Sequence, residues 1–194
     1  MGRVIAGPGH NNGPTMEAAR AWRQHCWKKA RADLLPHLPI EILRGRVRRA
    51  KELGLDYKTY ASVRASTGQD VVGFLFSSNA VRAFRKSPDL PAEHLKALAG
   101  LTDCARVALV CEPLTPAQLL AANPDVFDGA QTAPNIWHNW PQSREIVQSA
   151  LRSGRLPADG VLLIGEGELE REWSTAGRLA GFLASDRFFT GATP

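Results

Sequence analysis

The sequence predicts an α/β fold, in which a basic segment of three helices precedes a small, mainly parallel sheet of about three strands with helices on both faces. Two observations predict it. Three continuous apolar runs of strand length alternate with helix-like segments in residues 67–194, as is typical of buried parallel strands. Upstream, apolar residues recur at helical spacing. We therefore expect a flexible N-terminal arm over residues 1–14, a basic helical segment over 15–66 and an α/β domain over 67–194.

The composition is that of a globular protein. The chain has 194 residues, of which 44% are hydrophobic, so it can bury a sizeable core. No apolar run approaches the roughly 20 residues of a membrane helix, and no signal peptide is evident, so we expect a cytoplasmic protein without membrane contact. The three cysteines, Cys26, Cys104 and Cys111, lack metal-ligand spacing, and we expect no metal site among them.

Positive charge is concentrated in the first third of the chain. Residues 1–66 carry 13 Lys and Arg against 5 Asp and Glu, a net +8, whereas residues 67–194 carry 11 against 14, a net −3. A basic segment of this kind is typical of proteins that bind polyanions such as nucleic acid. Solvated basic faces on two ordinary helices are the alternative.

Within this segment we expect one helix from Thr15 to about Leu34, a second from about Ile40 to Leu53, and a short third helix. Gly54 suits a sharp turn between the last two, because it tolerates a positive φ. Asp56 is placed to cap the third helix. Its buried face would hold Tyr60 and Val63, and its outward positions would be Tyr57, Lys58, Ala61, Ser62 and Ala65.

This stretch resembles the helix-turn-helix of bacterial repressors of the lactose-repressor type, in the run Ala50, Gly54, Leu55, Thr59, Ala61 and Val63. The resemblance implies that the last helix enters the major groove of double-stranded DNA and that the protein acts as a dimer. It implies base-edge contacts by Tyr57, Lys58 and Ser62, and phosphate contacts by Arg46, Arg48, Arg49 and Arg64. A plain helical hairpin is the alternative. The N-terminal run GHNNGP also resembles tails of alphaproteobacterial and phage-related proteins, which suggests an origin but no chemistry.

The rest of the chain alternates strands and helices. We expect strands at Val71–Phe76, Arg106–Cys111 and Val161–Ile164. Helices are expected at Ala80–Lys86, Pro91–Leu98, Pro116–Ala122, Arg144–Arg152 and Glu170–Leu183. Between Asn123 and Pro141 we expect a connection pinned to the core by Trp137 and Trp140; a ligand lid formed by these residues is the alternative.

Ligands of open parallel sheets bind beyond the carboxyl ends of the strands. The candidates for a ligand site are six residues that follow the expected strands and one, His138, in the aromatic connection. The six are Ser77, Ser78, Asn79, Glu112, Glu166 and Glu168. Gly165 and Gly167 begin like a dinucleotide loop, but the third glycine is missing, and no other phosphate-loop or nucleophile motif occurs. We expect no cofactor.

Two functions follow as alternatives. The first is a DNA-binding regulator of bacterial or mobile-element origin whose α/β domain senses a ligand or mediates dimerisation. The second is an α/β enzyme, a metal-dependent hydrolase or nuclease acting on a phosphorylated or nucleic-acid substrate. In the second, Glu112, Glu166 and Glu168 would bind a divalent cation.

Overall fold

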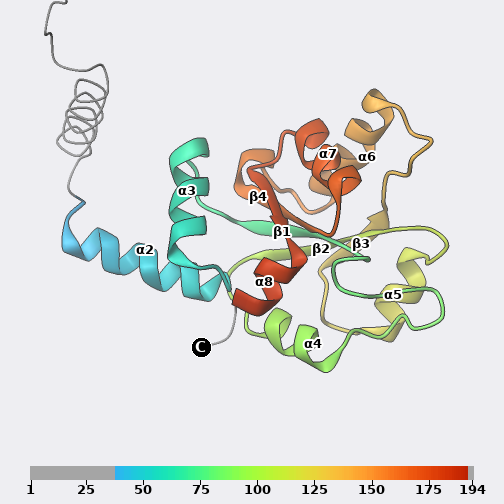
Figure 1. The fold of residues 1–194 in the computed structure, drawn as a ribbon, viewed down its shortest axis with the longest axis horizontal. Helices are drawn as coiled ribbons and strands as arrows, with labels where there is room; N and C mark the ends of the chain where they lie inside the picture. Colours follow the sequence, from blue (N-terminus) through green and yellow to red (C-terminus); the bar gives the residue numbers. More distant parts are fainter. Residues whose placement is uncertain (1–37, 192–194) are drawn as a thin grey trace, which may run out of the picture. The chain divides into compact units, whose positions relative to one another are not determined.

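The computed structural model describes residues 38–191 of the chain, and these form an α/β fold around one parallel sheet. The sheet has five strands in the order β3-β2-β1-β4-β5 (Figure 1). The strands are β1 (Gly73–Ser77), β2 (Ala105–Val110), β3 (Gly129–Thr132), β4 (Val161–Gly165) and β5 (Gly181–Ala184). The helices are α2 (Ile40–Glu52), α3 (Tyr57–Thr67), α4 (Ala92–Ala99), α5 (Pro116–Ala122), α6 (Trp140–Ser153), α7 (Glu168–Gly177) and α8 (Ser185–Gly191), and a 3-10 turn spans Ala158–Gly160.

Helices cover both faces of the sheet, as the continuous apolar strands require. In β1, Phe74 and Phe76 point to one face and Leu75 to the other. The phenylalanine side packs against α4, α5, α8 and the α2–α3 segment, and the opposite side packs against α6 and α7 (Figure 1). The two buried clusters are separate because side chains alternate along each strand.

The strand order reverses at β1, which pairs with β2 on one side and with β4 on the other. Phe76 near the end of β1 is level with Ala108 in β2 and Ile164 in β4. The carboxyl ends of these strands therefore meet at a topological switch point, where open parallel sheets form their ligand crevices.

The expectation of about three strands was wrong, because β3 and β5 were missed. β3 has the sequence GAQT and β5 the sequence GFLA, each of 4 residues, and neither is a long apolar run. Both lie at the sheet edges, where less burial is required. The expected closing helix over 170–183 ends early, because Arg178 adopts a left-handed conformation that caps α7.

The expected helix over 80–86 is also wrong, since this stretch forms consecutive turns. Backbone bonds from Val81 to Ser77 and from Ala83 to Ser78 close them, and Phe84 bridges to Ser87. Arg82 has a positive φ of 58°, which an α-helix cannot contain. The apolar residues Ala80, Val81 and Ala83 are nonetheless buried, so their spacing reflected burial and not helical structure.

Residues 41–191 lie in one compact unit, so most of α2 and all of α3 belong with the sheet. The expected N-terminal arm, the first helix and Cys26 lie outside the described residues. Among residues 38–191, none of the helices has the length and apolar character needed to cross a membrane.

Candidate functional site

The turn between α2 and α3 is built around Gly54. Its φ is 63°, and a Cβ placed there would lie 3.0 Å from the Leu101 side chain, so both conformation and space favour glycine. The N–H of Leu55 donates to the carbonyl of Ala50 at 2.9 Å, and Leu53 and Leu55 are buried on either side. The turn is therefore fixed by its own hydrogen bonds and by the core beneath it.

Asp56 caps α3, as its position after the turn predicts. Its carboxylate accepts hydrogen bonds from the N–H of Thr59 at 2.9 Å and from the Thr59 hydroxyl at 2.5 Å. These hydrogen bonds lower the pKa of Asp56 below its ordinary value, because they favour the charged form. The cap also balances the positive end of the helix dipole.

Two of the arginines expected to contact phosphate are instead bound within the protein. Arg49 lies 3.3 Å from the Asp70 carboxylate and donates to the carbonyl oxygens of Val71 at 3.1 Å and Asp103 at 2.9 Å. Arg64 lies 3.5 Å from the same carboxylate. Arg49 thus joins α2 to the residues before β1 and β2, and Arg64 joins α3 to Asp70 before β1.

The remaining residues of the expected interface lie on the outer surface of α2 and α3. The Arg48 side chain is 80% exposed and is 3.9 Å from Glu52, a contact that solvent screens. Lys58 and Ser62 are exposed on α3, and Arg46 is half-exposed on α2. Tyr57 differs from expectation, because it is half-buried against the core cluster of the phenylalanine side.

A buried glutamate, Glu170 of α7, occupies the switch point between β1 and β4. It is not among the residues expected at a ligand site, because nothing in the sequence distinguishes it from the exposed acids nearby. It is 3% exposed, and its carboxylate accepts hydrogen bonds from the Ser77 hydroxyl and, at 3.0 Å, from the Asn79 amide. It also accepts from the backbone N–H groups of Glu166 and, at 3.2 Å, Gly167.

This arrangement gives the incomplete dinucleotide motif a physical explanation. Glu170 stands at the position of the missing third glycine, and its carboxylate accepts hydrogen bonds from the N–H groups of Glu166 and Gly167, the two residues before α7. A pyrophosphate would need those donors. Glu170 therefore acts as an internal anion at this helix start, and it joins the loop after β4 to the loop after β1.

The other candidates for a ligand site do not converge. Ser78 accepts a hydrogen bond from the N–H of Cys111 at 3.0 Å and is buried, and its role is to join β1 to β2. Burial raises the pKa of the neighbouring Cys111 thiol, which favours its neutral form. Glu112 and Glu168 are exposed. His138 accepts from the N–H of Asn135 at 2.9 Å within its own loop.

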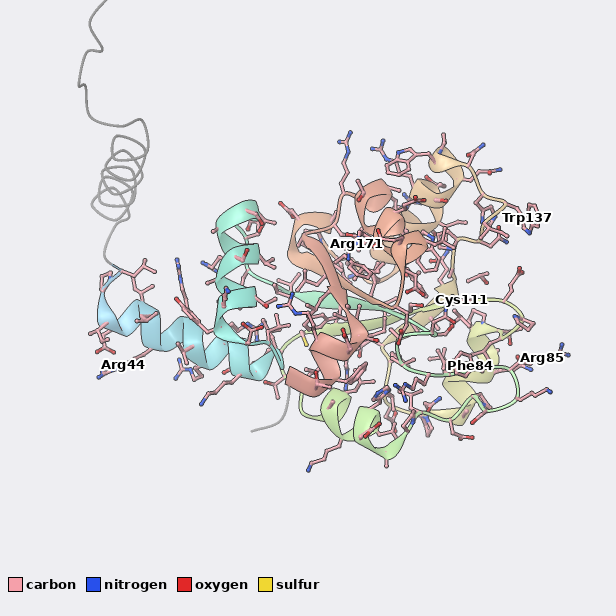
Figure 2. All side chains as sticks on the ribbon, viewed as in Figure 1. Arg44, Phe84, Arg85, Cys111, Trp137 and Arg171 are labelled. Atoms are coloured by element: carbon pink, nitrogen blue, oxygen red, sulfur yellow. The ribbon has the colours of Figure 1, made fainter. Side chains whose placement is uncertain are left out.

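The aromatic connection is not pinned to the core, contrary to expectation. Trp137 is 85% exposed and Trp140 is 51% exposed, and Trp137 projects from the loop before α6 (Figure 2). At the start of α6, Asn139 accepts from the N–H of Gln142 at 3.0 Å. The loop is held by this cap and by hydrogen bonds within it, such as the one from the N–H of Trp137 to the Asn135 side chain at 3.1 Å, and not by aromatic packing.

The carboxylates of the enzyme alternative do not form a metal centre. Within the described residues, no group of three or more His, Cys, Asp or Glu side chains could hold a metal ion. Glu166 is committed in part to the Ser185 hydroxyl, which donates to it at 2.6 Å.

A cleft of about 240 Å³ lies beside the carboxyl ends of β4 and β5. Of the residues expected at a ligand site, only Glu166 lines it. Its other polar side chains were not expected there, and they come from the loop after β1, from α4 and from α8: Arg82, Glu93, His94, Ser185, Asp186 and Thr190. No short motif contains them, because they come from three separate segments and meet Glu166 from a fourth.

No family model and no curated protein matches this chain. Function is therefore inferred from two features of the described residues. One is the basic outer surface of α2 and α3, and the other is the exposed aromatic connection before α6.

Proposed function

We propose that the protein is a DNA-binding regulator that contacts double-stranded DNA through the outer surface of α2 and α3. We define this basic surface as Arg46, Arg48, Lys51, Lys58 and Ser62. The observation that carries the proposal is that its cations flank a fixed glycine turn and, within the described residues, are not paired with Asp70, which binds Arg49 and Arg64; Arg48 lies 3.9 Å from Glu52.

Charge supports this proposal. Residues 38–66 carry 7 Lys and Arg against 3 Asp and Glu, a net +4 over two short helices. Arg49 and Arg64 share the single carboxylate of Asp70, and the other five cations are exposed or half-exposed. Cations at a protein surface attract the phosphate backbone and release its condensed counterions, which provides much of the affinity for DNA.

The anchoring of both helices supports it further. The guanidinium of Arg49 and the hydroxyl of Tyr60 both reach Asp70, so α2 and α3 are fixed to the sheet domain before any ligand binds. A preorganised surface loses less conformational entropy on binding than a mobile one. Arg49 and Arg64 thus have a supporting role in the proposal and no direct contact with phosphate.

Roles within the basic surface follow from position. Lys58 and Ser62 lie one helical turn apart on the exposed side of α3, where they would reach base edges in the major groove. Arg46, Arg48 and Lys51 on α2 would contact phosphates. A regulator of this geometry would use a homodimer to reach two half-sites about one DNA turn apart.

Lysine footprinting would test the proposed surface. The purified protein is acetylated with and without a duplex, and each lysine is followed by mass spectrometry. We expect Lys51 and Lys58 to be protected by DNA, whereas Lys86 and Lys96, which are exposed in the loop after β1 and on α4, stay reactive. Equal protection of all four lysines, or protection of none, would contradict the proposal.

A further inference from the structure

We propose that the loop before α6 and α6 itself form a surface that binds single-stranded nucleic acid. This site is separate from the basic surface of α2 and α3, and it does not depend on the proposed function. Three large apolar side chains within five residues carry it: Ile136, Trp137 and Trp140 are 68%, 85% and 51% exposed. We define these three residues as the tryptophan patch. Neighbouring large apolar side chains at a surface mark an interaction site, whereas isolated ones do not.

The backbone that carries the tryptophan patch is fixed. The N–H of Ala133 donates to the carbonyl of Val110 at 2.8 Å, which continues the pairing of β3 with β2 by one residue. The N–H of Asn135 donates to the His138 ring at 2.9 Å, and Asn139 caps α6. The patch is therefore ordered before a ligand binds, which lowers the entropic cost of binding.

A groove of about 440 Å³ runs along α6 beside the patch. Trp140 and Pro141 line one end of it, and Arg144 and Arg152 line it about one and three helical turns further along. Arg152 is paired with Glu145 at 2.5 Å. Within residues 38–191, Arg144 forms no ion pair. Its exposed guanidinium can therefore bind an anionic group of a ligand that lies in the groove.

The charge around the patch fits a polyanion. Residues 134–157, which include the patch and α6, carry 3 Arg against 1 Glu, a net +2. Residues 67–194 carry 11 Lys and Arg against 14 Asp and Glu, so the remainder of this domain carries 8 against 13, a net −5. The segment is thus the basic part of an acidic domain, and phosphate groups would be attracted to it and away from its surroundings.

A single strand supplies the groups that match both kinds of side chain. Its bases are planar and stack on exposed indole rings, and its phosphates pair with guanidinium groups. In a duplex the base faces are already stacked on one another, so Trp137 and Trp140 could not reach them. An acidic peptide would supply carboxylates to Arg144 but no ring to the tryptophans. These differences favour an unpaired nucleic-acid strand.

Fluorescence anisotropy of labelled oligothymidylate and oligouridylate tests the proposal with the full chain. We expect dissociation constants of about 10⁻⁶–10⁻⁴ M, the range of sequence-independent binding, and the tighter probe distinguishes DNA from RNA. Trp137→Ala should weaken binding about fivefold or more, the effect of losing one stacked base. Trp137→Phe keeps a ring at this position and should retain most of the affinity.

A second pair of variants tests the charge. Arg144→Gln should reduce the slope of log K against log salt by about 0.7, the value for one phosphate contact on a single strand. The matched controls are Phe84→Ala and Arg85→Gln, which alter an exposed ring and an exposed cation in the loop after β1, apart from Trp137 (Figure 2). Both controls should bind the strands as the parent does.

The two nucleic-acid surfaces can be tested independently. Arg48→Ala, Lys58→Ala should keep the single-strand binding that Trp137→Ala weakens, and Trp137→Ala should keep the duplex binding of the parent. If the single strands bind only through Arg48 and Lys58, the proposed role of the tryptophan patch is wrong, while the proposed function is unaffected. Thermal unfolding of each variant verifies that it is folded.

Other results would also overturn the proposal. One is that neither oligonucleotide binds at low salt, and another is that Phe84→Ala weakens binding as much as Trp137→Ala does. Tighter binding of a polyglutamate peptide than of either strand, lost in Trp137→Ala, would assign the patch to an acidic protein. Dimerisation in sedimentation experiments that Trp137→Ala abolishes, without strand binding, would assign it to a second copy of the chain.

Discussion

Tyr60 donates a hydrogen bond of 2.7 Å to Asp70, which joins α3 to the residues that lead into β1. The same carboxylate lies 3.3 Å from Arg49 and 3.5 Å from Arg64. One side chain thus holds both helices of the turn segment to the sheet domain. This contact gives Arg49 and Arg64 a structural role.

Replacing Asp70 should loosen this junction. Asp70→Asn keeps the size of the side chain but removes the charge that balances Arg49 and Arg64. We expect a loss of about 1–2 kcal/mol in the free energy of unfolding, measured with urea, because hydrogen bonds to charged groups are lost. Asp89→Asn, at an exposed position, is the control and should cost less than about 0.5 kcal/mol. Equal costs for the two variants would contradict the anchoring role.

Glu170 should be among the most sensitive positions of the fold. Glu170→Gln replaces one carboxylate oxygen, which accepts hydrogen bonds, by an NH2 group, which donates them. In this buried site the NH2 group would face the N–H groups that now donate to Glu170. We expect a loss of about 2–4 kcal/mol in the urea unfolding free energy. Glu168→Gln removes a neighbouring carboxylate whose side chain is 84% exposed. That variant should unfold almost as the parent does, and a comparable loss there would rule out a special role for Glu170.

The two ends of α7 offer a matched pair of glycine substitutions. A Cβ at Gly177 would lie 2.4 Å from Val147 of α6, whereas a Cβ at Gly167 would meet no atom within 4 Å. Gly177→Ala should therefore cost about 1–3 kcal/mol through overpacking. Gly167→Ala should change the unfolding free energy by less than about 1 kcal/mol. Similar urea midpoints for both variants would show that α6 and α7 are not packed this closely.

Stability should fall in alkaline solution. Burial raises the pKa of Cys104 and Cys111, and burial together with Asp70 raises the pKa of Tyr60. The unfolded thiols lose their protons from about pH 8.5, while the folded ones retain them. The stabilisation is thus complete below that pH and is lost as pH rises toward the folded pKa values.

Urea midpoints between about pH 7.5 and 10 measure this loss. The double variant Cys104→Ala, Cys111→Ala should show a smaller decline than the parent, because only Tyr60 of the three groups remains. Cys26 is present in the parent and in the double variant, so its ionisation contributes equally to the pH dependence of both. Parallel declines would mean that the two thiols ionise as readily in the folded protein as in the unfolded chain.

Much of the fold could be predicted from the sequence because its strands are continuous apolar runs. β1, β2 and β4 lie where those runs predict them, and the turn at Gly54 and the cap at Asp56 follow from single residues with strong conformational preferences. β3 and β5 could not be predicted in this way. Each is short and is stabilised by pairing with a neighbour, which is a tertiary effect.

The candidate sites were harder to predict, since they depend on partners far apart in the chain. Arg49 and Lys58 are both cations near the same turn. Arg49 is paired with Asp70 and Lys58 is exposed, and only the position of Asp70 in the fold distinguishes them. Glu166 and Glu170 are likewise both acids after β4, but one is exposed and the other is buried among donors. Sequence spacing alone carries no information about these contacts.

The most direct test of the proposed function is the salt dependence of DNA binding. The affinity of the protein for a labelled duplex is measured by fluorescence anisotropy across a salt series, for the parent and for Arg48→Ala, Lys58→Ala. The control is Arg85→Ala, Lys86→Ala, which removes two exposed charges from the loop after β1; Arg85 lies far from Arg44 of α2 (Figure 2).

If the basic surface contacts DNA as proposed, the slope of log K against log salt should decrease in magnitude by about 1 in the first variant, because Arg48 is its phosphate contact, and the loss of Lys58 should lower the affinity further. The control variant should keep the slope of the parent. DNA binding with equal slopes in all three proteins, or no binding at low salt, would contradict the account.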